Sequence, residues 1–468
     1  MKKYNIKELL QKNLIFQEVV VNGWVRSFRS NRFIVLNDGS SLKNLQIIVM
    51  ESNFSKEFLK KITVGIALQI KGIFTESPGK KQVAEVISTV IKIYNKVSVK
   101  DLHKTILQPK PHKLEKLREQ AHLRFRTKLF SSVMRIRHQL SFCVHEYFHN
   151  NGFFYIHTPI ITSSDAEGVG DMFRVTFLNL NSLPRDDQQC IDHTKDFFGR
   201  ETYLSVSGQL EGETAAMSLG QIYTFGPTFR AENSNTSRHL SEFWMIEPEM
   251  AFYEITDNMN LAEDFLKNLI INILNKCKED IYFLNKIFII EYKSCKEGTL
   301  LERLQLIVDH SFCRISYTEA IAILARLPKF KHTVQWGIDL QSEHERYLVE
   351  HFCRPIILLD SPAQVKAFYM RLNDDKKTVS SMDILFPIIG EVIGGSQREE
   401  RYDLLLNSMQ TLGIYEKSLW WYIDTRRFGS APHSGFGLGF DRFVQFVTGM
   451  VNIRDVIPYP RTPKNAEF

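Results

Sequence analysis

The chain has 468 residues, of which 44% are hydrophobic and 24% are charged. These proportions are ordinary for a soluble globular protein, so they exclude collagen-like, low-complexity and disordered classes. At roughly 100–200 residues per domain, the length predicts two to four domains. No apolar run approaches the ~18 uncharged residues of a membrane span. The opening MKKYNIKELLQKNLIF resembles neither a signal peptide nor a transit peptide. We therefore expect an intracellular, cytoplasmic protein that makes no membrane contact.

The cysteines also indicate the compartment of the protein. They are scattered along the chain and form no CxxC pair, so the sequence predicts neither a zinc site nor a disulfide framework. Such usage fits a reducing compartment best. The six residues are Cys143, Cys190, Cys277, Cys295, Cys313 and Cys353.

The net charge of +6 is unevenly distributed. Residues 1–100 hold 17 Lys and Arg against 7 Asp and Glu, which makes this part +10 and the remainder −4. A basic small domain attached to a slightly acidic large one favours a polyanion such as nucleic acid at the basic end. A merely solvated basic surface is the alternative that charge alone leaves open.

From Val19 to Val97 the sequence is typical of short β-strands. Five runs rich in Val, Ile and Phe are separated by turn residues at 37–40 and 77–79, with a possible helix at 53–62. Five strands in about 80 residues predict a small closed barrel of the OB type, a fold that often binds single-stranded nucleic acid. Phe33 is either a base-stacking platform on this barrel or a core residue.

Residues 98–125 carry two prolines, many charges and no sustained apolar stripe, which is typical of a hinge. Apolar residues then recur every three or four positions between Thr127 and Asn151, and Gly152 follows as a C-terminal cap. This pattern predicts a long helix. A strand, FFYIHTPIIT, follows directly, and Pro159 limits its pairing as at a sheet edge or an interface.

Two further strand-like runs, QIYTFGPTFR and EFWMIEPEMAFY, lie within residues 203–253 and are separated by the polar loop AENSNTSRHLS. Residues 258–350 are predicted to be mostly helical. Strand-like segments return at 353–360 and 366–372 and in DILFPIIGEVIGGSQRE, before the Gly-rich HSGFGLGFDRFVQFVTGM passes into a helical pattern.

Two arginines stand out because they occur in apolar surroundings. Arg230 ends the run YTFGPTFR, and Glu232 follows two residues later. An arginine in such a setting needs an anionic partner, and its planar fork suits a phosphate or a carboxylate. A structural ion pair is the alternative. Arg442 follows glycines that allow close approach of a ligand, so it is a second candidate for binding phosphate.

The segment GEVIGGSQRE contains a third group of charges. Glu391 precedes paired glycines and Arg398 lies seven residues on. Glu391, together with Asp383, has the hard oxygen atoms that hold Mg²⁺ against the phosphates of a nucleotide. The pattern is also compatible with a glycine bulge and a surface ion pair.

The order of these segments resembles motifs 1, 2 and 3 of the class II aminoacyl-tRNA synthetases. The matching subclass has an N-terminal OB domain and serves aspartate, asparagine and lysine, and within it the similarity to the asparaginyl-tRNA synthetase family is greatest. The resemblance extends from the hinge to the C-terminus. The segments that carry it are AHLRFRT (121–127), FFYIHTPIITSSDAEGVGDMF (153–173), SVSGQLEGE (205–213), FGPTFRAENSNTSRHLSEFWMIEPEMAF (225–252), GEVIGGSQREER (390–401), PHSGFGLGFDRF (432–443) and TGMVNIRDVIPYPRTPKNAEF (448–468).

The resemblance implies an α+β protein with three parts. Residues 1–102 would form the OB-fold anticodon-binding domain, 103–125 a hinge, and 126–468 a catalytic domain built on an antiparallel β-sheet flanked by helices. The implied partners are tRNA(Asn), ATP and L-asparagine, and the implied cofactor is Mg²⁺. Pro159 belongs to a dimer interface in relatives, so a homodimer is expected.

The resemblance also implies a two-step reaction in which asparagine is first activated with ATP and then transferred to the 3′ end of the tRNA. Arg230 would bridge the substrate carboxylate and the α-phosphate. Arg442 would hold the far phosphates and sandwich adenine against Phe243. Glu232 would contact adenine or the tRNA end. The remaining residues implied at the nucleotide are Arg238 and His239 of the mobile loop and Glu391.

Asp383 and Glu391 match the Mg²⁺ ligands of the family. In the OB domain, Phe33 and Gln46 occupy the positions that stack on and hydrogen-bond to the central base of the anticodon. Glu167 would take the α-ammonium group of the amino acid, and Arg398 would read its side-chain carbonyl oxygen. The other residues implied around the amino acid are Ser207, Gln209 and Glu242.

Gly212 bears on the choice between asparagine and aspartate. Aspartyl relatives carry QSPQL followed one residue later by Lys, a second cation for the substrate carboxylate, and Gly212 stands at that place. A pocket with one arginine and acidic neighbours such as Glu211 or Glu242 suits a neutral amide. The alternatives are an aspartyl-tRNA synthetase that charges both tRNAs, a non-catalytic RNA-binding paralogue and an amide-forming enzyme. The retained charged positions and the basic N-terminal part disfavour the last two.

Overall fold

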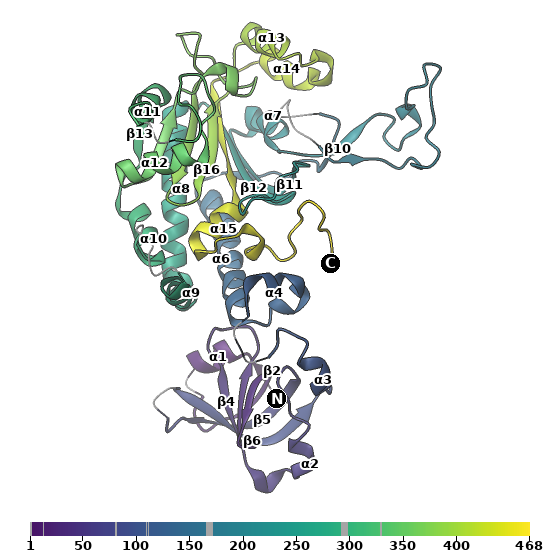
Figure 1. The fold of residues 1–468 in the computed structure, drawn as a ribbon, viewed down its shortest axis with the longest axis vertical. Helices are drawn as coiled ribbons and strands as arrows, with labels where there is room; N and C mark the ends of the chain where they lie inside the picture. The colour runs from purple at the N-terminus through teal and green to yellow at the C-terminus, as the bar shows by residue number, and fades with distance from the viewer. Residues whose placement is uncertain are drawn as a thin grey trace. The chain divides into compact units, whose positions relative to one another are not determined.

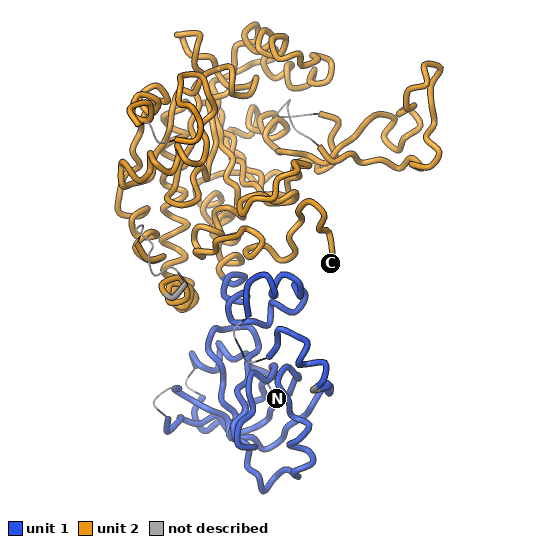
Figure 2. Tube along the Cα trace, in the orientation of Figure 1, with its two compact units in different colours: residues 1–135, 468 blue, residues 136–467 orange. Residues whose placement is uncertain are grey.

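The computed structural model describes residues 2–12, 14–79, 82–108, 110, 112–164, 172–291, 298–327 and 330–468. The chain divides into two compact units, residues 1–135 with Phe468 (unit 1) and residues 136–467 (unit 2), coloured separately in Figure 2. The predicted bounds of an OB domain, a hinge and a catalytic domain stay a prediction. None of the helices in the described parts of the chain has the length and apolar character needed to cross a membrane.

Unit 1 is built on a closed five-stranded barrel, as the sequence predicts. The strands pair in the order β2-β3-β4-β6-β5, and a further pairing of β5 with β2 closes the ring. Only β4 and β6 pair in parallel within this ring. The strands are β2 (Glu18–Arg29), β3 (Phe33–Asn37), β4 (Leu45–Val49), β5 (Ala67–Glu76) and β6 (Ala84–Ile93).

Strand β5 shows most clearly how the barrel strands place one face on the core. In β5, Leu68, Ile70 and Phe74 are buried while the residues between them are half-buried, as expected for a strand with one face on a core. At Gly72 a side chain would overlap the carbonyl oxygen of Ile87, and the register of β5 with β6 shifts there. The glycine therefore lets the two strands bend past each other.

Short helices complete unit 1. The first, α1 (Ile6–Gln11), begins with a capping box between Asn5 and Glu8 and buries Ile6 and Leu9 in the barrel core. Within the segment predicted to be a hinge, the structure has helices of four to six residues rather than an extended link. The shorter elements of the unit are β1 (Lys3–Tyr4), η1 (Glu51–Asn53), α2 (Lys56–Leu59), α3 (Val99–Leu102), α4 (Leu114–Glu119) and α5 (Ala121–Arg124).

Unit 2 is built on an eight-stranded sheet in the order β13-β14-β15-β16-β17-β12-β11-β7 (Figure 1). Its six central strands are antiparallel, and only the end strands β13 and β7 pair in parallel with their neighbours. The α+β prediction is therefore confirmed. The strands are β7 (Phe154–Tyr155), β11 (Gln221–Phe229), β12 (Glu242–Ala251), β13 (Cys313–Ser316), β14 (Ile356–Leu359), β15 (Ser381–Phe386), β16 (Gly390–Gln397) and β17 (His433–Gly439).

The long predicted helix is α6 (Lys128–Asn150), and Gly152 follows it with a φ of +83°. That left-handed conformation suits glycine as a C-terminal stop, as predicted. The apolar stripe of the helix is buried, and Phe148 stacks on Tyr223 of β11 with ring centroids 4.5 Å apart. The helix therefore anchors the edge of the sheet.

Helices also dominate the described part of residues 258–350, as predicted. The first of them, α8 (Ile255–Lys276), begins with a capping box at Glu254 and Asp257 and packs its apolar side against β15, β16 and β17. Figure 1 shows α8 alongside β16. The others are α9 (Lys278–Glu291), α10 (Leu300–Asp309), α11 (Tyr317–Leu324) and α12 (Ser342–Phe352).

Two predicted strands differ in the structure. FFYIHTPIIT forms only β7 and β8 (Ile161–Thr162), and these strands lie in different sheets on either side of Pro159, which cannot donate to a ladder. Residues 366–372 form no strand: η3 (Ala363–Val365) precedes them, and they make only isolated bridges such as Met370 with Arg398. Their apolar residues are buried in a local cluster instead, which explains the strand-like composition.

A small three-stranded sheet carries an arm that extends from unit 2 beyond β10 (Figure 1). The strands order as β8-β10-β9, with β9 (Arg174–Val175) and β10 (Thr202–Leu204) at the base of the arm and η2 (His193–Lys195) within it. The chain then enters α7 (Gln209–Leu219), which packs on β11 and β12. The remaining elements are α13 (Tyr402–Thr411), η4 (Glu416–Ser418), α14 (Trp420–Arg427), α15 (Phe440–Thr448) and η5 (Ile453–Asp455).

Candidate functional site

Strand β12 places a row of side chains on one face of the sheet. Successive residues of a strand point to opposite faces. The odd-numbered residues Phe243, Met245, Glu247 and Glu249 accordingly line cavities, while Ile246 on the other face is fully buried in the core. The run EFWMIEPEM therefore supplies an aromatic ring and two carboxylates to the same side.

Strand β17 pairs with β12 and offers glycines on that face. Gly439 lies opposite Met245, and Gly435 lies opposite Glu249. A side chain at Gly435 would overlap the Glu249 carboxylate, and a Cβ at Gly437 would lie 2.7 Å from Cε of Met245. The glycines thus leave space that the side chains of β12 and a ligand share.

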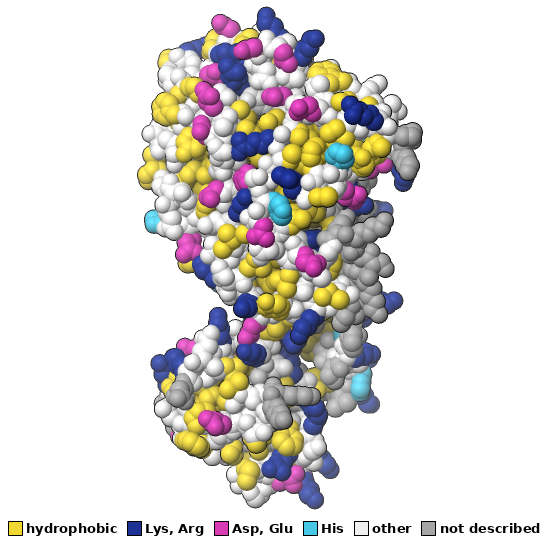
Figure 3. Space-filling model, turned by 90° about the vertical axis from the view of Figure 1, so that its left-hand side faces the viewer, with side chains coloured by type: hydrophobic (Ala, Val, Ile, Leu, Met, Phe, Trp, Pro, Cys, Tyr) yellow, Lys and Arg dark blue, Asp and Glu magenta, His cyan; other side chains and the backbone are white. Residues whose placement is uncertain are grey.

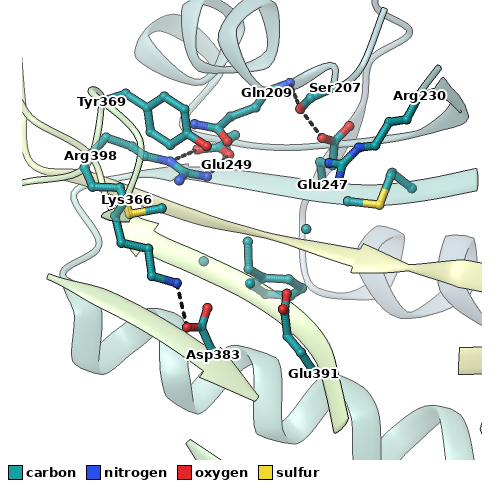
Figure 4. A pocket seen from close by; sticks show the side chains of 16 residues that line it. Ser207, Gln209, Arg230, Glu247, Glu249, Lys366, Tyr369, Asp383, Glu391 and Arg398 are labelled. Carbon is teal, nitrogen blue, oxygen red and sulfur yellow. Dashed lines mark hydrogen bonds and ion pairs between the residues drawn. The ribbon is translucent and has the colours of Figure 1, made fainter. Parts of the chain in front are cut away.

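A cavity of about 210 Å³ opens above these strands. Its lining comes from seven separate segments of unit 2 and holds three cationic and four anionic side chains (Figure 4). We call it the first cavity. It is lined by Ser207, Gln209, Arg230, Met245, Glu247, Glu249, Lys366, Tyr369, Met370, Asp383, Glu391, Gly394, Gly395, Arg398, Phe436 and Gly437.

One end of the first cavity is formed by a buried ion pair. Arg398 and Glu249 are 2% and 1% exposed. Arg398 donates from Nε to Glu249 Oε2 at 3.1 Å, from Nη2 to Glu249 Oε1 at 2.5 Å and from Nη1 to Ser396 Oγ at 2.8 Å. Burial shifts the pKa of Glu249 upward and the carboxylates of Glu213 and Glu247 add to that shift, while Arg398 opposes it. The bidentate pair fixes the plane of the guanidinium.

Behind this pair lies a second buried carboxylate, Glu213 of α7. It accepts from Arg426 Nη2 at 2.6 Å, from Tyr422 Oη at 2.8 Å and from Gln209 Nε2 at 3.0 Å, and its Oε2 lies 3.0 Å from His433 Nε2. Burial alone would raise the pKa of Glu213, but Arg426 and His433 outweigh it and hold the pKa below its usual value. A charged Glu213 therefore fixes the amide of Gln209.

The N-terminus of α7 is held by Glu247. Its carboxylate accepts hydrogen bonds from the Ser207 hydroxyl, from the Gly208 amide at 2.9 Å and from the Thr224 hydroxyl at 3.1 Å. A carboxylate is favourable beside the first amides of a helix. Ser207 and Gln209 consequently keep fixed positions in the wall of the cavity.

A second cavity of about 150 Å³ adjoins the first and shares Arg230, Met245, Glu391 and Gly437 with it. All seven residues that the resemblance implies at the nucleotide line this second cavity. The full lining is Arg230, Glu232, Arg238, His239, Leu240, Phe243, Met245, Glu391, Val392, Gly437, Gly439, Asp441, Arg442 and Ile453.

The second cavity is lined by three arginines and three carboxylates, and its arginines lie close to His239. Burial lowers the pKa of His239, and Arg442 lowers it further, so the imidazole is neutral at neutral pH. Burial and the charges of Arg346 and Arg442 likewise lower the pKa of Arg238, although Glu345 opposes them. Cations that depress one another's pKa in this way create a site for an anion.

Two of these cations are held by backbone carbonyls. Arg238 donates from Nη2 to the carbonyl of Ile388 at 2.5 Å, and Arg442 donates from Nη1 to the carbonyl of Glu391 at 2.8 Å. Arg442 lies in the first turn of α15, next to Asp441, which accepts from Arg137 of α6 at 2.5 Å and from the Trp244 amide at 2.8 Å. The position of Arg442 is thus fixed by a backbone carbonyl, and no described carboxylate is hydrogen-bonded to its guanidinium.

Asp383 of β15 and Glu391 of β16 are the predicted Mg²⁺ ligands. The Cβ position of Gly394 lies 3.1 Å from Glu391 Oε1 and 3.6 Å from Asp383 Oδ1, so the two carboxylates converge on the same place. Within the described ranges no group of three or more Asp, Glu, His or Cys residues is arranged for a metal. Two carboxylates fit Mg²⁺ when phosphate oxygens and water complete its shell.

One described residue that the resemblance implies around the amino acid is not brought into the cavities. Glu242 begins β12 on the face opposite Phe243 and is absent from the described linings of both cavities. Glu167 lies outside the described residues. The structure adds Glu247, Glu249, Lys366 and Tyr369, which the sequence did not single out. The i, i+2 spacing of Glu247 and Glu249 with Phe243 could have indicated the two glutamates.

The predicted anticodon residues share one face of the barrel in unit 1. Gln46 of β4 lies opposite Val35 of β3, so Phe33 and Gln46 point outward, while Ile34 and Ile47 are fully buried. The structure therefore decides against a core role for Phe33. Gln46 also donates from Nε2 to Glu85 Oε2 at 3.0 Å. On the face of unit 1 drawn in Figure 3, Lys and Arg outnumber Asp and Glu.

Comparison with known proteins gives a consistent picture. The family model for class II tRNA synthetases (D, K and N) matches residues 113–463. The asparagine–tRNA ligase of Cytophaga hutchinsonii is 55% identical over 475 residues, which cover all of both chains. The asparagine–tRNA ligase of Parabacteroides distasonis is 54% identical and covers 100% of this chain and 99% of its own.

Among solved structures, the fold is similar to asparaginyl-tRNA synthetase from Pyrococcus horikoshii complexed with asparaginyl-adenylate. The TM-score is 0.84, the sequence identity is 30%, and the similarity covers 100% of both chains.

Proposed function

Because this chain belongs to the class II tRNA synthetases that serve aspartate, lysine and asparagine, we propose that it is an asparagine–tRNA ligase acting through its two adjoining cavities. It activates asparagine with ATP to asparaginyl-adenylate and transfers the asparaginyl group to the 3′ end of tRNA(Asn). The observation that carries this function is that Arg230 lines both a polar cavity and the adjoining cavity that holds Arg238 and Arg442.

Asparagine occupies the first cavity. Glu249 and Ser396 take three of the five N–H groups of Arg398, which leaves donors for the carbonyl oxygen of the asparagine side chain. The side-chain amide donates to acceptors in the same wall. Gln209 supplies its amide oxygen there because its nitrogen is bonded to Glu213.

Aspartate is disfavoured by the same groups. Its carboxylate has no N–H to offer to Glu249 or Glu247 and is repelled by them, and such a mismatch among buried polar groups discriminates strongly. Gly212 supports this choice, because its Cβ position lies 3.7 Å from Cγ of Glu249. A lysine there would enter beside Glu249, whereas glycine adds no second cation.

Activation takes place where the two cavities meet. The carboxylate of asparagine attacks the α-phosphorus of ATP, pyrophosphate leaves, and the mixed anhydride forms. Arg230 lies between the two anions, so it reduces their repulsion and stabilises the charge that develops at phosphorus. Its guanidinium carbon lies 5.7 Å from the ring centroid of Phe243, a cation–π contact that helps to hold Arg230 in place.

The phosphates of ATP lie among Arg238, His239 and Arg442. Arg442 and Arg238 are fixed by carbonyls and therefore hold the far phosphates without a large rearrangement. Asp383 and Glu391 would hold Mg²⁺, which supplies positive charge to the phosphate oxygens when bound. Glu232 is at the rim of the same cavity, where it meets adenine or the incoming tRNA end.

The tRNA is recognised at its anticodon by the outer face of the barrel in unit 1. Phe33 stacks on the central base, and Gln46 reads its edge with an amide oriented by Glu85. F33A is expected to raise the KM for tRNA at least about tenfold, the effect of losing one base–aromatic stack. Pyrophosphate exchange, which uses no tRNA, should be unchanged. A rise in the KM for ATP instead would place Phe33 outside the anticodon site.

A homodimer is part of the proposal. Phe154 and Tyr155 form an edge strand of the eight-stranded sheet and are about half exposed, and Ile160 and Ile161 nearby are also exposed. Apolar residues at an unpaired edge are typical of an interface between copies. Light scattering of the pure protein should give twice the chain mass, and a mass of one chain would refute this part.

The decisive experiment is ATP–pyrophosphate exchange with each of the twenty amino acids in turn, with Mg²⁺ and without tRNA. Exchange with asparagine alone is the expected result. Exchange with aspartate would overturn the argument from Arg398 and Gly212 but keep the reaction. No exchange from folded protein would refute the ligase function and favour an RNA-binding role.

A further inference from the structure

Lys366 is a largely enclosed cation in the wall of the first cavity, beside the predicted metal ligands, and the reaction described above gives it no role. Its side chain is 17% exposed, and its Nζ lies 2.6 Å from Oδ2 of Asp383, whose side chain is 15% exposed. Figure 4 shows Lys366 extending to Asp383, with Glu391 nearby. Because both side chains are largely shielded from water, the attraction between the two charges is stronger than it would be at the surface.

The contact engages only one oxygen of Asp383. Lys366 is bonded to Oδ2, whereas Oδ1 is the oxygen that faces Gly394 together with Oε1 of Glu391. A lysine on one side of the carboxylate therefore turns the other oxygen toward Glu391. Partners of this kind orient metal-ligating carboxylates in many proteins.

The surroundings of Lys366 are otherwise acidic. A smaller cavity of about 80 Å³ adjoins the pair and is lined by Lys366, Asp383, Glu391, Asp339 and Glu345 among others. Four carboxylates with one ammonium group leave a net negative charge before a metal binds. The ammonium group limits the repulsion that would otherwise push Asp383 and Glu391 apart.

The segment that carries Lys366 is fixed independently of this contact. Met370 forms a bridge with Arg398, and Leu372 forms one with Val379. Tyr369 of the same segment lies against the guanidinium of Arg398, with its ring centroid 5.4 Å from the guanidinium carbon. Lys366 is therefore attached to the wall of the first cavity and reaches from there to Asp383.

We propose that Lys366 is a positioning residue that orients Asp383 and balances the charge of the Asp383–Glu391 pair, so that the pair takes Mg²⁺ together with ATP. The inference rests on the proposed function, because it assumes that a nucleotide brings the metal. In this proposal Lys366, although it lies in the wall of the first cavity, binds Asp383 rather than a substrate. It acts through Asp383, and its loss affects metal-dependent nucleotide binding rather than asparagine binding.

The test is ATP binding by calorimetry at a series of Mg²⁺ concentrations, without asparagine, so that no reaction occurs. In Lys366→Met, the Mg²⁺ concentration for half-maximal ATP affinity should rise about tenfold, the usual cost of losing a partner of a metal ligand. Lys366→Arg should restore most of the loss. A midpoint within twofold of that of the unaltered protein would overturn the proposal.

The chain offers a matched control. Lys267 pairs with Glu263 of the same helix at 2.8 Å, and the two side chains are 23% and 15% exposed. Lys267→Met removes a comparable ion pair away from both cavities and should leave the Mg²⁺ midpoint unchanged. Asparagine affinity without metal should also be unchanged in Lys366→Met, and a fall there would identify Lys366 as a substrate contact and overturn the proposal.

A double-mutant cycle covers the case in which Lys366→Met does not fold because it leaves Asp383 buried without its partner. Asp383→Asn and the double variant Lys366→Met/Asp383→Asn should then share one Mg²⁺ midpoint, because Lys366 acts through Asp383. A further tenfold shift in the double variant would refute that route. Failure of the ligase function would instead appear as no asparagine-dependent exchange in the unaltered protein, whatever the Mg²⁺ midpoints.

Discussion

The two cavities share Arg230, Met245, Glu391 and Gly437, yet they hold their charged groups in different ways. In the first cavity, the cation Arg398 is bonded to a carboxylate. In the second, Arg238 and Arg442 are bonded to backbone carbonyls. A carbonyl fixes an arginine but leaves its net charge in place, whereas a carboxylate cancels it.

This difference corresponds to the two kinds of substrate. An asparagine side chain is neutral, and a wall of paired charges recognises it by hydrogen bonds while it excludes a charged competitor. ATP brings several negative charges, and arginines that are held by backbone carbonyls attract them. In the first cavity the arginine is therefore paired with a carboxylate before asparagine binds. In the second cavity, the phosphates of ATP supply the anionic partners of the arginines.

The largest effect is expected where the two halves meet. Arg230→Ala should lower asparagine-dependent pyrophosphate exchange by about 10³-fold, because it removes a preorganised cation from the developing charge. Thermal unfolding should be little altered, which would separate loss of chemistry from loss of fold. Exchange near the level of the unaltered protein would remove Arg230 from the mechanism.

A second variant tests whether the Arg398–Glu249 pair of the first cavity sets the preference for asparagine over aspartate. Glu249→Gln should lower kcat/KM for asparagine about 100-fold, because Arg398 loses the bidentate partner that fixes its plane and the loss amounts to about 2.7 kcal/mol. The kcat/KM for aspartate should rise relative to that for asparagine, because the substitution removes a negative charge from the cavity wall. Glu146→Gln, which breaks an exposed pair with Lys276, is the control.

If the relative kcat/KM for aspartate does not rise in Glu249→Gln, the pairing of Arg398 with a carboxylate does not set the preference for asparagine. Pyrophosphate exchange with both amino acids, measured side by side, gives the answer directly.

Gly437 lines both cavities, and its role there can be tested by adding a single methyl group. In Gly437→Ala, the new Cβ would lie 2.7 Å from Cε of Met245 in both cavities. The KM values for asparagine and ATP should both rise, each by about tenfold or 1.4 kcal/mol. Gly226→Ala is a matched control, since nothing lies within 4 Å of its Cβ. A change in only one KM would show that Gly437 does not shape both cavities.

The smallest effect is a pH dependence beside the nucleotide half. Burial, together with Glu391 and Asp383, raises the pKa of Glu345 to about 7. Between its usual value of 4.5 and 7 the folded protein keeps a proton that the unfolded chain has lost, so stability falls as the pH rises through this window.

Glu345→Gln lacks this titration. The difference in unfolding free energy between the two proteins should change by about 1 kcal/mol from pH 5 to pH 8, with the glutamine variant gaining at high pH. Thermal unfolding at a series of pH values measures it. Parallel pH profiles would show that Glu345 is ionised like an ordinary carboxyl group.

Much of the architecture could be predicted because it depends on local patterns. Alternating apolar residues predicted the barrel strands, and spacing by three and four residues predicted α6 up to its stop at Gly152. The run 366–372 was misread as a strand, because burial in a local cluster and pairing in a ladder require the same apolar composition. A sequence pattern reports that residues are buried but not against what.

The candidate site shows the same division. The resemblance to the class II synthetases pointed to the residues around the nucleotide, and they do line one cavity. The sequence alone thus determined the element types, the closed barrel and the positions that carry charge, because these follow from periodicity and from residues near each other in the chain.

The pairing of charges was decided by the tertiary structure. Arg398 meets Glu249, Lys366 meets Asp383, and His433 meets Glu213, a residue 220 positions away. Such partners depend on strand order and register, which bring distant segments together and which no local pattern specifies.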